Sequence, residues 1–268
     1  MTVSRRVVLG GGMATCAVCA TGHSHVLAAQ SSFDGCLISP EVFNTAFEQK
    51  ANFSPVSDGL FERSRHFRST GNRAVDQDLE KGLALISDNF SVRPAFGFYD
   101  PNDPKYNDGD SEKIIMNAWA SEENTEIPGT TGTVAFGWDL FQDEFQKHDA
   151  TGVSIMAIAA HEFAHIWQGT SGNLKRLRVG NPRKSEINAD FLAGFFLGTR
   201  KLARKSLSFK AAGDLFDRLG ARSEGKPWRT HGNRIERLNA AEAGFRVAYV
   251  DRRDFRYAIA AGLDYVGL

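Results

Sequence analysis

The sequence predicts an α+β fold in which a small β-sheet packs against a mainly helical body. Three short segments rich in β-branched and aromatic residues, 93–99, 114–121 and 131–137, are predicted to be strands. The remaining predicted elements have helical spacing of apolar residues, and they cover 72–89, 139–147, 151–169, 185–198, 209–219 and 233–249. Strands gathered in one part of the chain and helices in the rest indicate the α+β class, in which helices pack on one face of a sheet.

The N-terminus has the composition of an export signal. Arg5 and Arg6 directly precede an apolar run, and residues 7–32 contain no Lys, Arg, Asp or Glu. The run is too short and too weakly apolar for a stable membrane span, and its paired arginines resemble a twin-arginine signal. We expect residues 1–29 to be a signal peptide cleaved near Ala29, and the protein to be periplasmic or secreted in a bacterium. A lipoprotein or an uncleaved anchor is the alternative.

Composition limits the nature of the chain beyond the signal. We expect an N-terminal extension over 30–71 and one main domain over 72–268, with 20 phenylalanines for an aromatic core. Lys plus Arg and Asp plus Glu both number 32, so no net charge favours a nucleic-acid or membrane-surface partner. We expect no membrane span in the mature chain. Cleavage near residue 29 leaves Cys36 as the only cysteine, which excludes an intramolecular disulfide.

Residues 161–165 read His-Glu-Phe-Ala-His and match the H-E-x-x-H pattern. Positions four apart lie on one face of a helix, so His161 and His165 can bind one zinc ion at about 2.0–2.1 Å. Glu162 then lies beside the ion and can act as general base. The alternative is a pair of core histidines that are hydrogen-bonded to the backbone.

A second predicted helix, 185–198, supplies two carboxylates four residues apart. Glu186 is the candidate third ligand, because catalytic zinc commonly has two histidines and one glutamate. Asp190 is placed to accept the N–H of a ligating histidine and to fix its tautomer. Alternatively, both are ordinary carboxylates in a first helical turn, where the helix dipole favours them.

The two motifs together resemble a known family. His-Glu-Phe-Ala-His followed by E-x-x-A-D over 186–190 is similar to the gluzincin zinc metallopeptidases, in particular the group with the heat-shock membrane proteases, the CAAX prenyl proteases and the bacterial neutral zinc metallopeptidases. Residues 117–120, Asn-Ala-Trp-Ala, followed by 132–141 resemble the family's Asn-Ala-Phe-Ala segment, edge strand and following helix. Residues 230–238 resemble its Thr-His-Pro…Arg-Ile segment, with Gly232 in place of proline.

The resemblance implies a zincin-like domain over about 72–250. It implies that an edge strand binds an extended substrate, with Asn117 and Ala118 as contacts, and that His231 lies near the metal as a catalytic group. His231 or Arg234 would donate to the developing oxyanion.

The expected function is therefore an exported zinc metalloendopeptidase that acts on proteins or peptides, with one zinc per chain. Another periplasmic zinc hydrolase that cleaves cell-wall peptides is an alternative, and so is a metal-bound interaction protein without activity. A chance motif without metal is the remaining possibility.

A basic cluster falls between the two ligand-bearing segments. It consists of Lys175, Arg176, Arg178, Arg183 and Lys184. It predicts either a solvated loop or a positive patch that attracts acidic substrates or a peptide carboxylate.

Overall fold

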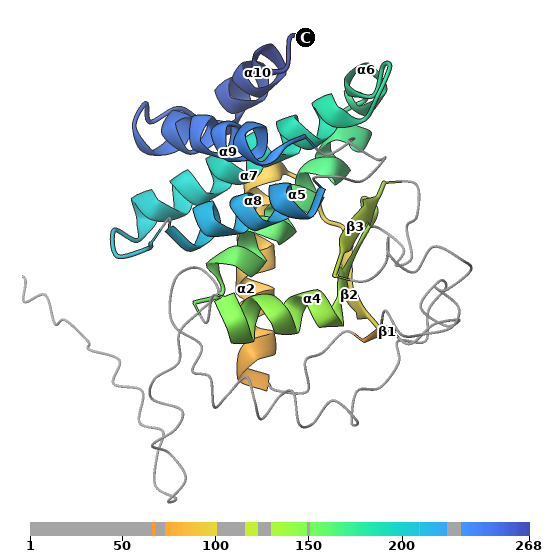
Figure 1. The fold of residues 1–268 in the computed structure, drawn as a ribbon, viewed down its shortest axis with the longest axis vertical. Helices are drawn as coiled ribbons and strands as arrows, with labels where there is room; N and C mark the ends of the chain where they lie inside the picture. The colour runs from red at the N-terminus through yellow and green to blue at the C-terminus, as the bar shows by residue number, and fades with distance from the viewer. Residues whose placement is uncertain are drawn as a thin grey trace, which may run out of the picture.

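The computed structural model describes residues 66–67, 73–100, 116–122, 130–148, 151–208, 210–223 and 232–268 (Figure 1). The predicted signal peptide, nearly all of the predicted extension and His231 lie outside the described residues. Within them the protein is a mixed α and β structure with far more helix than strand, as the α+β prediction requires.

A four-stranded sheet forms one side of the molecule. Its strands are β1 (His66–Phe67), β2 (Ala95–Tyr99), β3 (Ala118–Ser121) and β4 (Thr133–Gly137), in the order β1-β2-β4-β3. β2 and β4 are parallel, whereas β1 pairs with β2 and β3 pairs with β4 in antiparallel fashion. The three predicted strands are present, although β3 begins four residues later than predicted, and β1 was not predicted.

β3 is an edge strand of the described sheet. The amide of Gly137 donates to the carbonyl of Asn117 at 2.9 Å, so these two opposed residues form a hydrogen-bonded pair. Bonded and non-bonded pairs alternate in an antiparallel ladder. The N–H and C=O groups of Ala118 and Ala120 therefore point away from β4, toward the outer edge.

Most of the other described residues are helical. The helices are α2 (Arg73–Phe90), α4 (Trp138–Asp143), the π-helical η5 (Glu144–His148), α5 (Val153–Thr170), α6 (Leu174–Leu177), α7 (Arg183–Ala203), α8 (Lys210–Ser223), α9 (Arg234–Tyr249) and α10 (Phe255–Tyr265). The prediction of one helix over 139–147 is wrong in its second half, which is the π-helix η5. α6 and α10 were not predicted. No helix among the described residues has the length and apolar character needed to cross a membrane.

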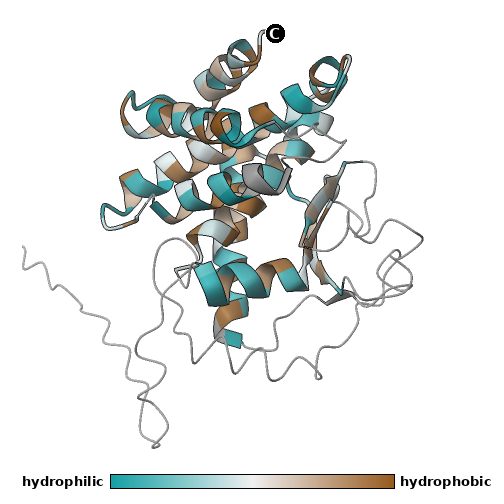
Figure 2. Ribbon diagram, in the orientation of Figure 1, coloured by the Kyte–Doolittle hydropathy of each residue, from teal (hydrophilic) through white to brown (hydrophobic). Residues whose placement is uncertain are grey.

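The core is aromatic, as the phenylalanine count predicts. Phe98 packs edge-on against Phe141 and Trp138, with ring centroids 5.0 and 5.2 Å apart. α5 runs through this core and is buried along nearly its whole length. The strands are mostly apolar in Figure 2, whereas hydrophilic residues mark the outer turns of α6, α8 and α9.

α7 and α9 approach each other closely because glycines line their contact. A Cβ on Gly194 of α7 would overlap the backbone of Ala241, and a Cβ on Gly244 of α9 would overlap the backbone of Phe191. The two backbones are therefore held at a separation that any side chain at these positions would increase.

We predict that Gly244→Ala lowers the free energy of unfolding by about 3 kcal/mol, because the added methyl group forces α7 and α9 apart. Gly213→Ala on α8 is the matched control, since the nearest atom to its Cβ is Cδ1 of Leu238 at 4.0 Å. The control should gain roughly 0.5–1 kcal/mol from helix propensity. Denaturant titration of both variants makes the comparison, and equal stabilities would contradict the close-contact account.

Candidate metal centre

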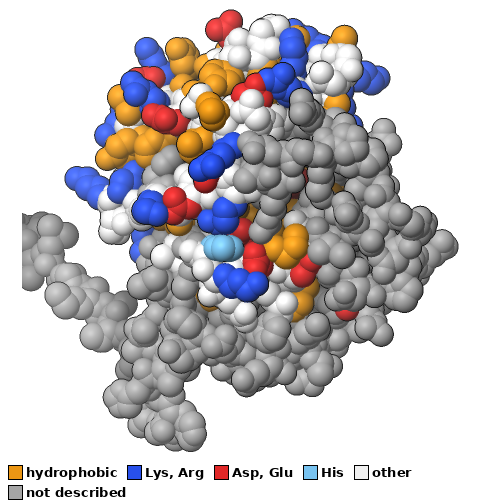
Figure 3. Space-filling model, in the orientation of Figure 1, with side chains coloured by type: hydrophobic (Ala, Val, Ile, Leu, Met, Phe, Trp, Pro, Cys, Tyr) orange, Lys and Arg blue, Asp and Glu red, His pale blue; other side chains and the backbone are white. Residues whose placement is uncertain are grey.

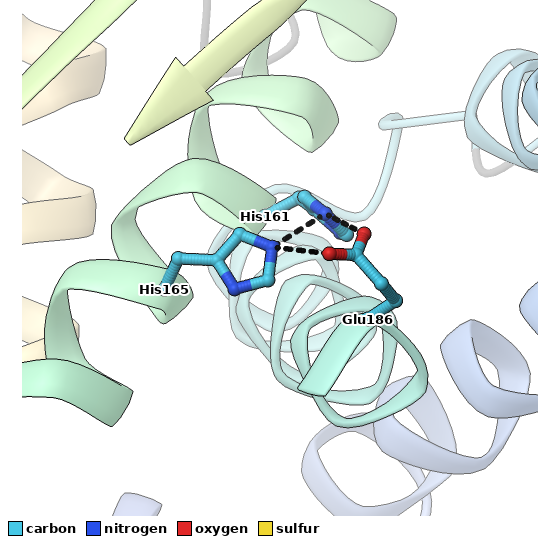
Figure 4. A group of neighbouring side chains, drawn as sticks. All are labelled: His161, His165 and Glu186. Carbon is cyan, nitrogen blue, oxygen red and sulfur yellow. Dashed lines mark hydrogen bonds and ion pairs between the residues drawn. The ribbon is translucent and has the colours of Figure 1, made fainter. Parts of the chain in front are cut away.

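Three potential metal ligands converge where α5 passes the first turn of α7. His161 and His165 come from α5 and Glu186 from α7, and their side chains point toward one another (Figure 4). Nε2 of His161 lies 3.1 Å from Nε2 of His165. The Glu186 carboxylate lies 3.4 Å from His161 Nε2 through Oε2 and 3.5 Å from His165 Nε2 through Oε1.

These separations fit a metal ion. Ligand atoms about 2.0–2.1 Å from a tetrahedral centre are about 3.3–3.4 Å from one another. The three observed separations lie within a few tenths of an ångström of that value. His161 and Glu186 are each only 7% exposed, so the ligand atoms face an almost closed site that can hold a metal ion.

His161 is oriented by a buried carboxylate. Its Nδ1 lies 2.8 Å from Oδ1 of Asp190, the contact that the spacing of Glu186 and Asp190 predicts. A carboxylate at this position accepts the Nδ1–H and leaves the Nε2 lone pair directed at the metal position.

Arg237 of α9 completes this arrangement. Its Nε donates to Oδ2 of Asp190 and its Nη2 to Oδ1, both at 2.8 Å. Asp190 is 0% exposed and Arg237 6% exposed, so this is a bidentate pair removed from water. An Asn233–Glu236 capping box begins α9 and places Arg237 in its first turn. Sequence reasoning missed Arg237, although it lies in the segment 230–238.

His165 is oriented by an amide. Its Nδ1 lies 2.9 Å from Oε1 of Gln168. The Gln168 amide nitrogen donates to the Ser185 carbonyl at 2.8 Å and to Oδ1 of Asn188 at 3.0 Å, so its oxygen is the atom that accepts from His165. This fixes the tautomer of His165 with Nε2 free for metal. Gln168 was not identified from the sequence. It could have been found as a lone glutamine in an apolar helix, one turn after the second histidine.

The electrostatics of the site favour a cation. Burial by itself lowers the pKa of His161, but the carboxylates of Asp190 and Glu186 outweigh it and raise the pKa to about 10. Burial raises the pKa of Asp190, but Arg237 and His161 outweigh it and lower that pKa. In the metal-free protein, His161 therefore holds its second proton firmly. The two carboxylates that stabilise this proton also attract a divalent cation.

The other predicted site residues are distributed as follows. Glu162 lies between the two histidines in the sequence and is 7% exposed. Burial lowers the pKa of Arg237, but the charges of Asp190, Glu186 and Glu162, in that order, outweigh it and raise that pKa. The carbonyl of Asn117 accepts from Gly137 and from the Tyr99 hydroxyl, so it is turned toward the sheet. The role of the Asn117 side chain stays a prediction. Arg234 pairs with Asp217 of α8.

Gly232 has φ +81°, which proline cannot adopt, and a Cβ added to it would lie 2.6 Å from Cδ1 of Ile187. The residue after His231 therefore packs against the helical turn that carries Glu186.

A second acidic group lies at the start of η5. Donor atoms of Asp143, Glu144 and His148 also lie close together. Lys147 pairs with Asp143 at 2.6 Å and Arg218 pairs with Glu144, so cations already compensate both carboxylates. We assign no metal to this group.

Comparisons of the chain with protein-family models, with curated proteins and with solved structures found no match. The site is therefore interpreted from its own geometry.

We predict that Arg237→Met weakens zinc binding about 10- to 100-fold, because Asp190 loses the partner that holds it against His161. The uncompensated carboxylate should also cost about 3–5 kcal/mol of stability. Chelator competition measures the affinity. Arg234→Gln, three residues away and half-exposed, is the control and should change neither quantity appreciably. Equal zinc affinity of the two variants would show that Arg237 does not contribute to metal binding.

We also predict that zinc binding at neutral pH releases about one proton, because the ligand histidine His161 is protonated up to a pKa of about 10 in the metal-free protein. Zinc affinity should consequently rise by about tenfold per pH unit toward that value. Calorimetry in buffers of different ionisation enthalpy counts the proton. A heat of binding that does not depend on the buffer would show that His161 is neutral before metal binds.

Proposed function

We propose that this chain is a zinc-dependent metalloendopeptidase with a zincin-like domain. The observation that carries the proposal is the triangle of His161, His165 and Glu186 at tetrahedral spacing, with a glutamate adjoining it on α5. A structural zinc site is closed by four protein ligands, whereas three ligands leave a position for a substrate or water. The described residues supply three.

Glu162 is the proposed general base. When bound, zinc lowers the pKa of a water molecule and polarises a carbonyl group. The Glu162 carboxylate accepts the proton of the attacking water as its oxygen adds to the scissile carbonyl carbon. It then donates that proton to the amide nitrogen as the C–N bond breaks, which yields a carboxylic acid and an amine. The proton of the acid passes to the amine, so that a carboxylate and an ammonium leave.

The outer edge of β3 is the proposed substrate-binding strand. The outward N–H and C=O groups of Ala118 and Ala120 can pair with an extended peptide, as in strand addition. Gly132 directly precedes β4, the strand paired with β3. A Cβ added to Gly132 would lie 2.9 Å from Cδ1 of Ile166 on α5, the residue next to His165. A peptide on this edge therefore runs beside the active-site helix.

The proposed location is outside the cytoplasm, in the periplasm or medium. This rests on the paired arginines and the uncharged run of the N-terminal sequence.

The first test is metal content by elemental analysis of the full chain. Wild type should hold one zinc, and Glu186→Ala should lose it or bind it much more weakly, because two imidazoles alone leave the site without its carboxylate. Wild type without stoichiometric metal after zinc is offered would exclude the proposal.

The second test separates catalysis from binding. We predict that Glu162→Gln retains zinc but loses about 10²–10⁴-fold in kcat on peptide substrates, because glutamine cannot accept the proton. Glu80→Gln, an exposed glutamate of α2, is the matched control and should retain full activity. A wild-type chain that binds zinc but cleaves neither protein substrates nor cell-wall peptides would indicate an interaction protein instead.

A further inference from the structure

The segment between the two ligand-bearing helices is cationic. Residues 171–185 contain five Lys or Arg and no Asp or Glu, in a chain whose charges otherwise balance at 32 of each sign. A local excess of this kind creates a positive potential that the net charge of the protein does not reveal.

Three of these cations are held outward by a fixed helical turn. Leu174 and Leu177 are buried and anchor α6 on the core, and the amide of Arg178 closes the turn on the Leu174 carbonyl at 2.9 Å. Lys175 and Arg176 of α6, and Arg178 directly after it, are all exposed. We call these three residues the α6 patch.

The α6 patch has no carboxylate partner among the described residues. Arg176 contacts only the amide oxygen of Asn173, at 3.4 Å. By contrast, the other two cations of the segment are engaged, since Arg183 pairs with Glu236 and Lys184 donates to the Gly267 carbonyl at 3.3 Å. Protein surfaces ordinarily intersperse charges of both signs, so three neighbouring uncompensated cations offer a site for an anionic partner.

The α6 patch lies at one end of the proposed substrate-binding strand. A Cβ on Gly169, at the end of α5, would overlap the side chain of Glu122, which directly follows β3. α6 begins four residues after α5 ends, and Figure 1 shows it beyond this end of the sheet. Blue side chains lie over α6 at the upper right of Figure 3.

The distance from the metal ligands sets which substrate residues reach this patch. His165 is five residues before the end of α5, or about 7.5 Å along the helix. An extended peptide covers about 3.3 Å per residue. Substrate residues about three or more positions from the scissile bond therefore pass the α6 patch.

The surface favours a peptide over a lipid bilayer. Membrane-surface helices bury a broad apolar face, whereas the leucines of α6 are turned into the core. Val179, at 77% exposure, is the one large apolar side chain exposed in 171–185. We propose that the α6 patch selects protein substrates that carry a cluster of Asp or Glu on one side of the scissile bond. This rests on the proposed peptidase function.

The test uses the zinc-loaded full chain and three fluorogenic peptides with the same central sequence. One peptide is neutral, one carries three acidic residues on the amino side, and one carries them on the carboxyl side. One acidic peptide should exceed the neutral peptide about tenfold in kcat/KM. The gain should disappear in a variant with Lys175→Gln, Arg176→Gln and Arg178→Gln together, and at an ionic strength of about 1 M, where the Debye length is about 3 Å.

The control variant removes three other exposed cations, Arg252, Arg253 and Arg256, and should keep the preference. If no peptide is cleaved above the Glu162→Gln background, the proposed function itself fails. If all three peptides are cleaved equally, or both triple variants lose the preference alike, the selection proposal alone is overturned. Equal cleavage together with patch-dependent binding to phosphatidylglycerol vesicles would assign the patch to a lipid surface instead.

Discussion

A buried ion pair, Arg237 with Asp190, is the interaction on which the rest of the centre depends. The surroundings of the metal position hold three carboxylates, Glu162, Glu186 and Asp190, all nearly closed to water. Charges of one sign at this density are unstable in a protein interior unless fixed charges of the other sign compensate them. Arg237 supplies a permanent charge, and its planar fork fits both oxygens of Asp190, which the point charge of a lysine would not.

The ion pair of Arg237 with Asp190 depends on the close packing of α7 against α9. Gly194 lies one helical turn after Asp190 on α7, and Gly244 lies two turns after Arg237 on α9, so each glycine shares a face with the charged residue of its helix. The absence of side chains at the glycines brings the backbones together. The same approach brings the guanidinium within hydrogen-bonding distance of Asp190. A helix outside the ligand set thereby determines how His161 is oriented.

The sequence predicts this centre unequally, for physical reasons. His161, His165, Glu186 and Asp190 follow from the four-residue periodicity of a helix, which is a local property. Arg237 is 47 residues from Asp190, and nothing local distinguishes it among 32 Lys and Arg. Only the tertiary contact of α7 with α9 selects it.

The same division holds for the fold. The strands β2 and β4 have apolar composition that is readable locally, whereas β1 has two residues, too few to show any periodicity. The π-helix η5 was predicted as an ordinary α-helix because its side-chain pattern is helical. The altered backbone hydrogen bonding of a π-helix leaves no mark in that pattern. α10 did carry a local signal that was overlooked, since Asp254 caps it by accepting from the amide of Tyr257.

The strand order has a consequence for how the molecule is made. β4 lies between β2 and β3 but follows both along the chain, so among the described strands β3 has no partner, and β2 has only the two-residue β1, until residue 137 has been synthesised. The ligand from α7 and the arginine from α9 come later still. During synthesis from the N-terminus, the segments made first must therefore wait for distant ones, which makes this a topology of slow, non-local closure. The three residues that could hold a metal ion therefore come together only after α7 has been made, and His161 acquires its orientation only after α9 has been made.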